Sequence, residues 1–166
     1  NARFEPGAVL CRVSESFVRF GSFEIFASRG DTGTLKTLAD YVIRHHFPSS
    51  ETGTEKYIQF FSQVAERTMK MVLHWQRVGF VHGVMNTDNM AVSGETIDYG
   101  PCAFLDEYHP AKVFSSIDRQ GRYAFGNQPG IGGWNLAQLA SSLLILMGPQ
   151  EQAVEEATQA VNTFTQ

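Results

Sequence analysis

The chain has 166 residues, a formal net charge of −4 and 43% apolar residues, which suits one globular domain with a hydrophobic core. The acidic balance argues against nucleic-acid binding, because no basic stripe exists to neutralise phosphates. We find no signal peptide and no apolar run that approaches membrane-spanning length, so we expect no membrane partner. Cys11 and Cys102 share no metal-ligand spacing and are too few for a disulfide framework, which favours a reducing compartment.

Two short runs of β-branched and aromatic residues near the start predict a hairpin, Val9–Val13 with Phe17–Phe20, turned at residues 14–16. A two-residue turn would place Arg12 and Arg19 opposite each other on one face. Opposed like charges repel unless an anion lies between them, and a nucleotide phosphate suits two guanidinium groups. Two solvated arginines on an edge strand are the alternative, which the residues alone favour.

We expect residues 23–27 to extend this sheet or to begin a segment that crosses away from it. The stretch 28–33 then marks the boundary between two lobes, because its glycine, serine and aspartate residues favour turns. The prediction is therefore a mainly helical α+β fold. In this fold 1–33 is the end of a smaller, N-terminal lobe and 34–166 is a larger helical lobe.

Apolar residues that recur every three or four positions predict helices in the larger lobe. The predicted helices cover about 35–47, 55–78, 134–147 and 154–164. Periodicity is strongest in 55–78, whereas 134–147 is apolar on most sides, which is typical of a buried helix. The connection 102–125 shows little periodicity, and we expect its charged residues mainly to order the loop.

The most informative stretch is 79–101, which predicts a short buried strand, a polar loop and a two-strand hairpin. The strand is residues 80–81, and the hairpin pairs 90–92 with 96–97. In kinase-like folds a long helix precedes the catalytic loop, and the helix predicted here ends just before Gly79. We therefore expect the catalytic loop of this chain at 79–101.

Three side chains of this stretch suit a magnesium site. Asp88 and Asn89 are adjacent in the loop, and Asp98 directly follows the hairpin. Magnesium takes a few hard oxygen ligands together with phosphate oxygens, so Asp98 with Asn89 or Asp88 would be sufficient. Asx turns use the same residue types and are the alternative explanation. The order of these residues, after a long helix and across a short hairpin, favours a nucleotide–magnesium site.

The loop differs from that of a typical kinase at one position. Small-molecule and atypical kinases often read HGDxxxxN, with the aspartate as catalytic base. Aligning His82-Gly83 with that motif places Asn89 on the metal-binding asparagine but Val84 on the aspartate. Asp88 is then the only carboxylate left in the loop. We expect His82 to hydrogen-bond the loop backbone rather than to act in acid–base catalysis.

Several long motifs resemble the selenoprotein O family, whose members are kinase-like protein adenylyltransferases. They are GAVLCRVSESFVRFGSFE, HGVMNTDNM, TIDYGP, DRQGRYAFGNQP and GGWNLAQLA, and they cover nearly the whole chain up to Met147. The resemblance implies a protein-kinase-like larger lobe that transfers AMP from ATP to Ser, Thr or Tyr hydroxyls of proteins. Ordinary phosphoryl transfer and a non-catalytic, nucleotide-binding pseudokinase module remain the alternatives.

The resemblance also implies roles for the candidate residues. Asp88 would be the base that activates the acceptor hydroxyl, while Asn89 and Asp98 would hold Mg²⁺, with Mn²⁺ as an alternative. Arg12 and Arg19, together with Asp98, would bind the nucleotide. This assignment reverses the preference for two solvated arginines.

In the resembled family a glycine-rich phosphate loop, a lysine and its glutamate partner lie upstream, and this chain contains none of them. We therefore interpret the chain as an internal fragment, which we expect to bind ATP weakly and to be inactive alone. The resemblance implies a cytoplasmic location in a bacterium and a mitochondrial one in a eukaryote.

Overall fold

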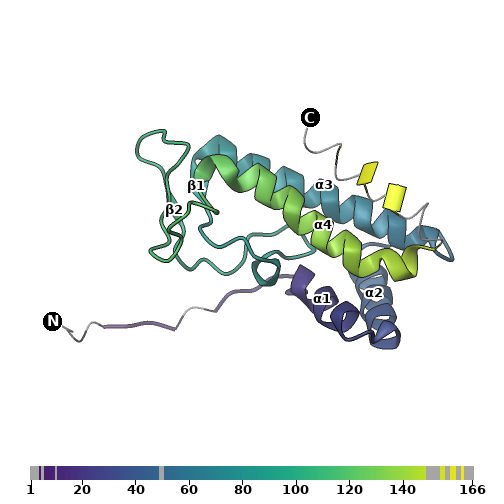
Figure 1. The fold of residues 1–166 in the computed structure, drawn as a ribbon. Coiled ribbons are helices and arrows are strands. Elements are labelled where there is room, and N and C mark those ends of the chain that lie inside the picture. The colour runs from purple at the N-terminus through teal and green to yellow at the C-terminus, as the bar shows by residue number, and fades with distance from the viewer. Residues whose placement is uncertain are drawn as a thin grey trace.

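The chain is mainly helical in the computed structural model, with a small two-stranded antiparallel sheet (Figure 1). The structure describes residues 4, 6–9, 11–48, 51–148, 154, 155, 158, 159 and 162. Its helices are α1 (Phe20–Ser28), α2 (Thr32–His46), α3 (Glu55–Val78) and α4 (Gln128–Met147). The strands are β1 (Phe80–Val81) and β2 (Ala103–Phe104), and the short 3₁₀ helices are η1 (Thr87–Asn89) and η2 (Phe125–Asn127).

Helices α3 and α4 lie side by side along the length of the domain, and α1 and α2 pack near one end of them (Figure 1). The predicted core face of α3 is confirmed except at its last position: Phe61, Val64 and Trp75 are buried, whereas Val78 is 60% exposed. The helix ends at Val78 and is capped by Gly79, whose φ of 69° lies in the left-handed region that glycine adopts most easily. The chain therefore passes from α3 directly into β1, as the sequence predicts.

Helix α4 is a core helix that begins at Gln128, before the predicted start at Trp134. Pro129 is tolerated there because a proline in the first turn of a helix removes an N–H that has no partner in the helix. Contrary to the sequence prediction, Phe125–Met147 is long and apolar enough to span a membrane by length and composition. More than half of that segment is buried inside the domain, so core packing explains its apolar character.

The hairpin predicted for residues 9–20 is wrong. Among the described residues, 11–18 form no strand and run as an extended chain. Val9 is 100% exposed and Val13 is 89% exposed, so these β-branched side chains have no sheet face to pack on. Two short strands without further partners are only marginally stable in water.

Residues 23–27, predicted to extend the same sheet or to cross away from it, belong to helix α1. Phe20 and Phe23 are completely buried, because their i, i+3 spacing puts both on one face of the helix. Helix α1 packs against α4 and α2. Burial of two large aromatic side chains in the helical core thus outweighs their preference for strands.

The other predicted elements are present with changes. Strand β1 pairs with β2, and the hairpin after η1 is reduced to a single antiparallel bridge between Met90 and Thr96. Asp118 orders the connection 102–125, since its carboxylate accepts the N–H groups of Arg122 and Tyr123 at 2.9 and 2.8 Å. Most of the predicted helix 154–164 lies outside the described residues, and the lobe boundary at 33 stays a prediction.

Candidate functional site

The polar loop meets the N-terminal end of α1. The N–H of Phe20, the first residue of α1, donates to the carbonyl of Met90 at 3.0 Å. Asp88 lies against the next residue, Gly21, where an added Cβ would overlap Asp88 Oδ1. Glycine at this position therefore makes room for the carboxylate. The positive end of the helix dipole favours the negative charge there.

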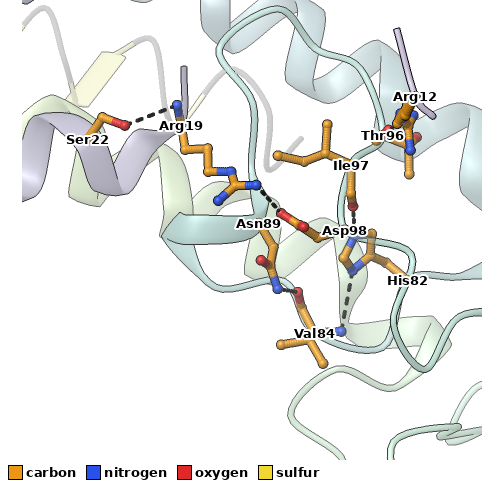
Figure 2. Close-up of polar contacts among 9 residues, drawn as sticks. All are labelled: Arg12, Arg19, Ser22, His82, Val84, Asn89, Thr96, Ile97 and Asp98. Carbon is orange, nitrogen blue, oxygen red and sulfur yellow. Dashed lines mark hydrogen bonds and ion pairs between the residues drawn. The ribbon is translucent and has the colours of Figure 1, made fainter. Parts of the chain in front are cut away.

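Asp98 reaches the same end of α1 through an ion pair. Its Oδ2 lies 2.8 Å from Nη2 of Arg19, the residue that precedes α1 (Figure 2). Asp98 also has a φ of 54°, and no other non-glycine residue in the described part of the chain has a positive φ. Such a conformation costs on the order of 1–3 kcal/mol, and residues held in it cluster at active sites and ligand-binding sites. The backbone strain therefore supports Asp98 as a functional residue.

The side chain of Asn89 is held inside the loop. Its Nδ2 donates to the carbonyl of Val84 at 2.9 Å (Figure 2). Because the nitrogen is engaged, Oδ1 is the atom left to bind a cation. An amide oxygen and a carboxylate oxygen are both hard ligands of the kind that Mg²⁺ prefers.

His82 connects the loop to the segment that carries Asp98. Its buried ring accepts the N–H of Val84 at Nδ1 (3.4 Å) and donates from Nε2 to the carbonyl of Ile97 (2.7 Å) (Figure 2). Burial lowers the pKa of His82, although both hydrogen bonds and the nearby Asp98 oppose the shift. A neutral imidazole, with one donor and one acceptor, matches these two partners. The predicted hydrogen bonds from His82 to the loop backbone are confirmed.

The predicted face-to-face arrangement of Arg12 and Arg19 is wrong, because the hairpin that would create it does not form. The guanidinium of Arg12 instead lies over the ring of Tyr99, 4.2 Å from its centroid. Its Nη2 donates to the Tyr99 hydroxyl at 3.0 Å and to the carbonyl of Thr96. Both arginines nevertheless contact residues 96–99. Tertiary contacts, rather than a hairpin, therefore bring them to the same segment.

Two buried carboxamides of α4 also hold the loop, and they were not predicted from the sequence. Oε1 of Gln128 accepts the N–H of His82, and its Nε2 donates to the carbonyl of Phe80, both at 2.9 Å. Nδ2 of Asn135 donates to the carbonyl of Met85 at 2.8 Å. The available signal was the presence of amide side chains within a helix that is otherwise largely apolar.

No group of three or more His, Cys, Asp or Glu side chains in the described ranges could hold a metal ion by itself. Magnesium in nucleotide sites takes only one or two ligands from side chains and the others from phosphates and water. Asp98 and Asn89 provide hard oxygen atoms close to one helix end, so the donor set fits a nucleotide-bound Mg²⁺ rather than a closed protein cage.

Fold and site together define a helical domain in which an Asp-Asn pair and a strained aspartate meet at the start of α1. The chain belongs to the family described as protein adenylyltransferase SelO, whose family model matches residues 2–166. The resemblance seen in the sequence motifs is therefore confirmed.

Curated relatives of this chain are named protein nucleotidyltransferase YdiU. The protein from Agrobacterium fabrum is 55% identical over 156 residues, which is 94% of this chain and 32% of that protein. The protein from Shouchella clausii is 55% identical over 160 residues, which is 96% of this chain and 33% of that protein. The chain thus spans about a third of the length of the curated relatives it matches.

Proposed function

We propose that this chain supplies the metal-binding and catalytic residues of a site that transfers AMP from ATP to Ser, Thr or Tyr hydroxyls of proteins. The observation that carries the proposal is the convergence of Asp88 and Asp98 on the start of α1, with Asn89 between them in sequence. Membership of the SelO family and the names of the relatives support nucleotidyl transfer. The full activity requires residues beyond the third of the relatives that the chain spans.

We also assign the chain to a protein-kinase-like fold, with residues 34–166 as part of the larger lobe and 1–33 as the end of the smaller one. The long helix α3 leads through β1 into the loop, and Asp98 follows the short bridge between Met90 and Thr96. This order of elements, which the sequence already indicated, supports the assignment. In this assignment the nucleotide would lie between the loop and the segment that carries Arg12.

The candidate residues divide the chemistry between them. Asp98 and Asn89 would hold Mg²⁺ or Mn²⁺, which neutralises negative charge on the transferred phosphoryl group when bound. Asp88 is exposed, so the hydroxyl of a protein substrate can approach its carboxylate and give up its proton there. Val84 occupies the position of the usual kinase base, which leaves Asp88 as the carboxylate of the loop that can act as the base.

Arg19 and Arg12 would bind the terminal phosphates of the nucleotide. Arg19 is 38% exposed in its pair with Asp98, so a phosphate can reach its guanidinium, and Arg12 is exposed too. Terminal phosphates bound at the arginines leave the α-phosphate nearest Asp88, Asn89 and Asp98. The acceptor oxygen then bonds to the α-phosphorus, the bond to the β-phosphate oxygen breaks, and pyrophosphate leaves.

Labelled ATP tests this proposal in a full-length family protein that carries this chain. With Mg²⁺ and a protein acceptor, label from α-labelled ATP should enter the acceptor, and label from γ-labelled ATP should not. Incorporation of the γ-label would instead indicate an ordinary kinase. Incorporation of neither label, together with measurable ATP binding, would indicate a non-catalytic nucleotide-binding module.

A further inference from the structure

We propose that Gln128 and Asn135 of α4 are positioning residues that set the geometry of the loop carrying Asp88 and Asn89. The inference rests on the proposed function for its catalytic readout, and it adds a role for a helix that contributes no residue to the chemistry. It starts from two fully buried amide side chains in the apolar core.

Gln128 behaves like an additional piece of strand beside β1. Its side chain accepts one backbone N–H, from His82, and donates one N–H to a backbone carbonyl, that of Phe80. These partners are two residues apart, which is the spacing at which a neighbouring strand would pair with them. Strand β2 pairs with β1 in antiparallel fashion, with Phe80 opposite Phe104. Gln128 thus satisfies backbone groups of the β1 segment that would otherwise be buried without a partner.

Asn135 lies about two helical turns after Gln128, on the same face of α4. Its Nδ2 donates to the carbonyls of Met85 and Ile131, at 2.8 and 2.9 Å. Its Oδ1 is buried and has no hydrogen-bond partner among the described residues. An unpaired buried polar group costs about 1–3 kcal/mol. If this position served only for packing, leucine would avoid the cost of the unpaired oxygen. We therefore attribute the asparagine to its hydrogen bond with the carbonyl of Met85.

The two amides hold both ends of the segment from His82 to Met85, directly before η1. Within that segment both backbone groups of Val84 are used, since its N–H donates to the His82 ring and its carbonyl accepts from Asn89. A continuous series of hydrogen bonds therefore runs from α4 to the side chain of Asn89. Misplacing a catalytic group by about 1 Å can cost about 10²-fold in rate.

The test replaces each amide by an apolar residue of similar size, Gln128→Met and Asn135→Leu, in a full-length family protein that carries this chain. We expect kcat for transfer from α-labelled ATP to fall about 10- to 100-fold, while KM for ATP changes less than about threefold. Leu143→Ala is the matched control, because Leu143 is fully buried on α4 and makes no hydrogen bond to the loop. It should lower Tm at least as much and keep kcat.

Amide hydrogen exchange provides a readout that does not depend on which group is transferred. Exchange across residues 82–90 should become faster in Gln128→Met and Asn135→Leu than in Leu143→Ala. Incorporation of label from γ-labelled ATP would therefore overturn the proposed function. The exchange data alone would then decide whether this inference holds. Unchanged exchange in the two amide variants, or an equal loss of kcat in the control, would overturn the inference.

Gln128→Glu keeps the test decisive if Gln128→Met does not fold. Glutamate has the same shape and retains the acceptor for the His82 N–H, but it can donate to the Phe80 carbonyl only when protonated. The kcat of this variant, divided by that of the unchanged protein at the same pH, should therefore rise as the pH falls. A ratio that is independent of pH would show that the donor has no positioning role.

Discussion

The loop 79–101 and the N-terminal segment 11–19 both contribute to the candidate site, but they are held in opposite ways. Several residues of the loop are themselves buried in the core: His82, Met85 and Met90 are all 0% exposed. The segment 11–18 is extended and mostly exposed, and its side-chain contacts with the hairpin, such as that of Ser14 with Glu95, lie near the surface. Exposed polar contacts contribute little to stability, whereas buried hydrogen bonds are costly to lose.

The buried loop and the exposed segment are therefore suited to different roles in the proposed reaction. The residues proposed for metal binding and proton abstraction belong to a loop that the core positions before any ligand binds, which favours catalysis. The arginines proposed for the phosphates make partly or fully exposed interactions that a phosphate can replace at small cost. Arg19 joins the N-terminal segment to the loop. Its backbone pairs with Ala91, and its side chain forms an ion pair with Asp98.

We expect the largest effect when the charged metal ligand of the loop 79–101 is removed. Asp98→Ala should abolish magnesium-dependent nucleotide binding and reduce transfer at least about 10³-fold, because it removes the charged ligand. Asp88→Ala should reduce kcat strongly while nucleotide affinity changes little, since a base acts mainly on the transition state. Calorimetry and single-turnover transfer assays separate the two variants. Equal losses of affinity would contradict these separate roles.

A methyl group at the start of α1 should disturb the loop from the opposite side. Gly21→Ala places a Cβ where Asp88 Oδ1 lies, so the carboxylate must move, and we expect kcat to fall about 10- to 100-fold. Gly130→Ala is the matched control, because a Cβ there meets no atom within 4 Å in the first turns of α4. Steady-state kinetics should show normal kcat for Gly130→Ala. Unchanged kcat in Gly21→Ala would show that Asp88 has freedom to move without loss of function.

Substitutions in the exposed segment should affect binding more than chemistry. Arg19→Ala and Arg12→Ala should each weaken nucleotide affinity about tenfold, in line with the loss of one charge-assisted phosphate contact. The effect of Arg19→Ala should be the larger, because Arg19 contacts Asp98 directly. Calorimetric titrations at low and high salt measure both effects, which should shrink as salt screens the charges. An unchanged affinity in both variants would remove the arginines from the site.

The smallest effect concerns the pH dependence of stability. Burial lowers the pKa of His82 below its ordinary value of 6.5, so the folded state disfavours the protonated ring. The stability that depends on the neutral ring is therefore present above pH 6.5 and is lost as the pH falls below it. His82→Gln cannot be protonated, and its Tm should fall less between pH 7.5 and pH 5. Identical decreases in both proteins would argue against a buried, neutral His82.

Local patterns were enough to predict helix α3, strand β1, the polar loop and the candidate residues Asp88, Asn89 and Asp98. These features depend on residues close together in sequence: a repeat of three or four positions, a glycine with positive φ, and polar side chains after a buried strand. The family could also be inferred from the sequence, because its motifs are long and follow one another along the chain.

Only the tertiary structure decided how residues distant in sequence meet. Phe20 and Phe23 suit a strand or a helix, and their burial against α4 and α2 selects the helix. Neither the pairing of Arg19 with Asp98 nor the hold of Gln128 and Asn135 on the loop is visible in sequence spacing. Their hydrogen bonds and ion pair join residues that lie 46 or more positions apart, so their formation depends on how the helices pack rather than on any local preference.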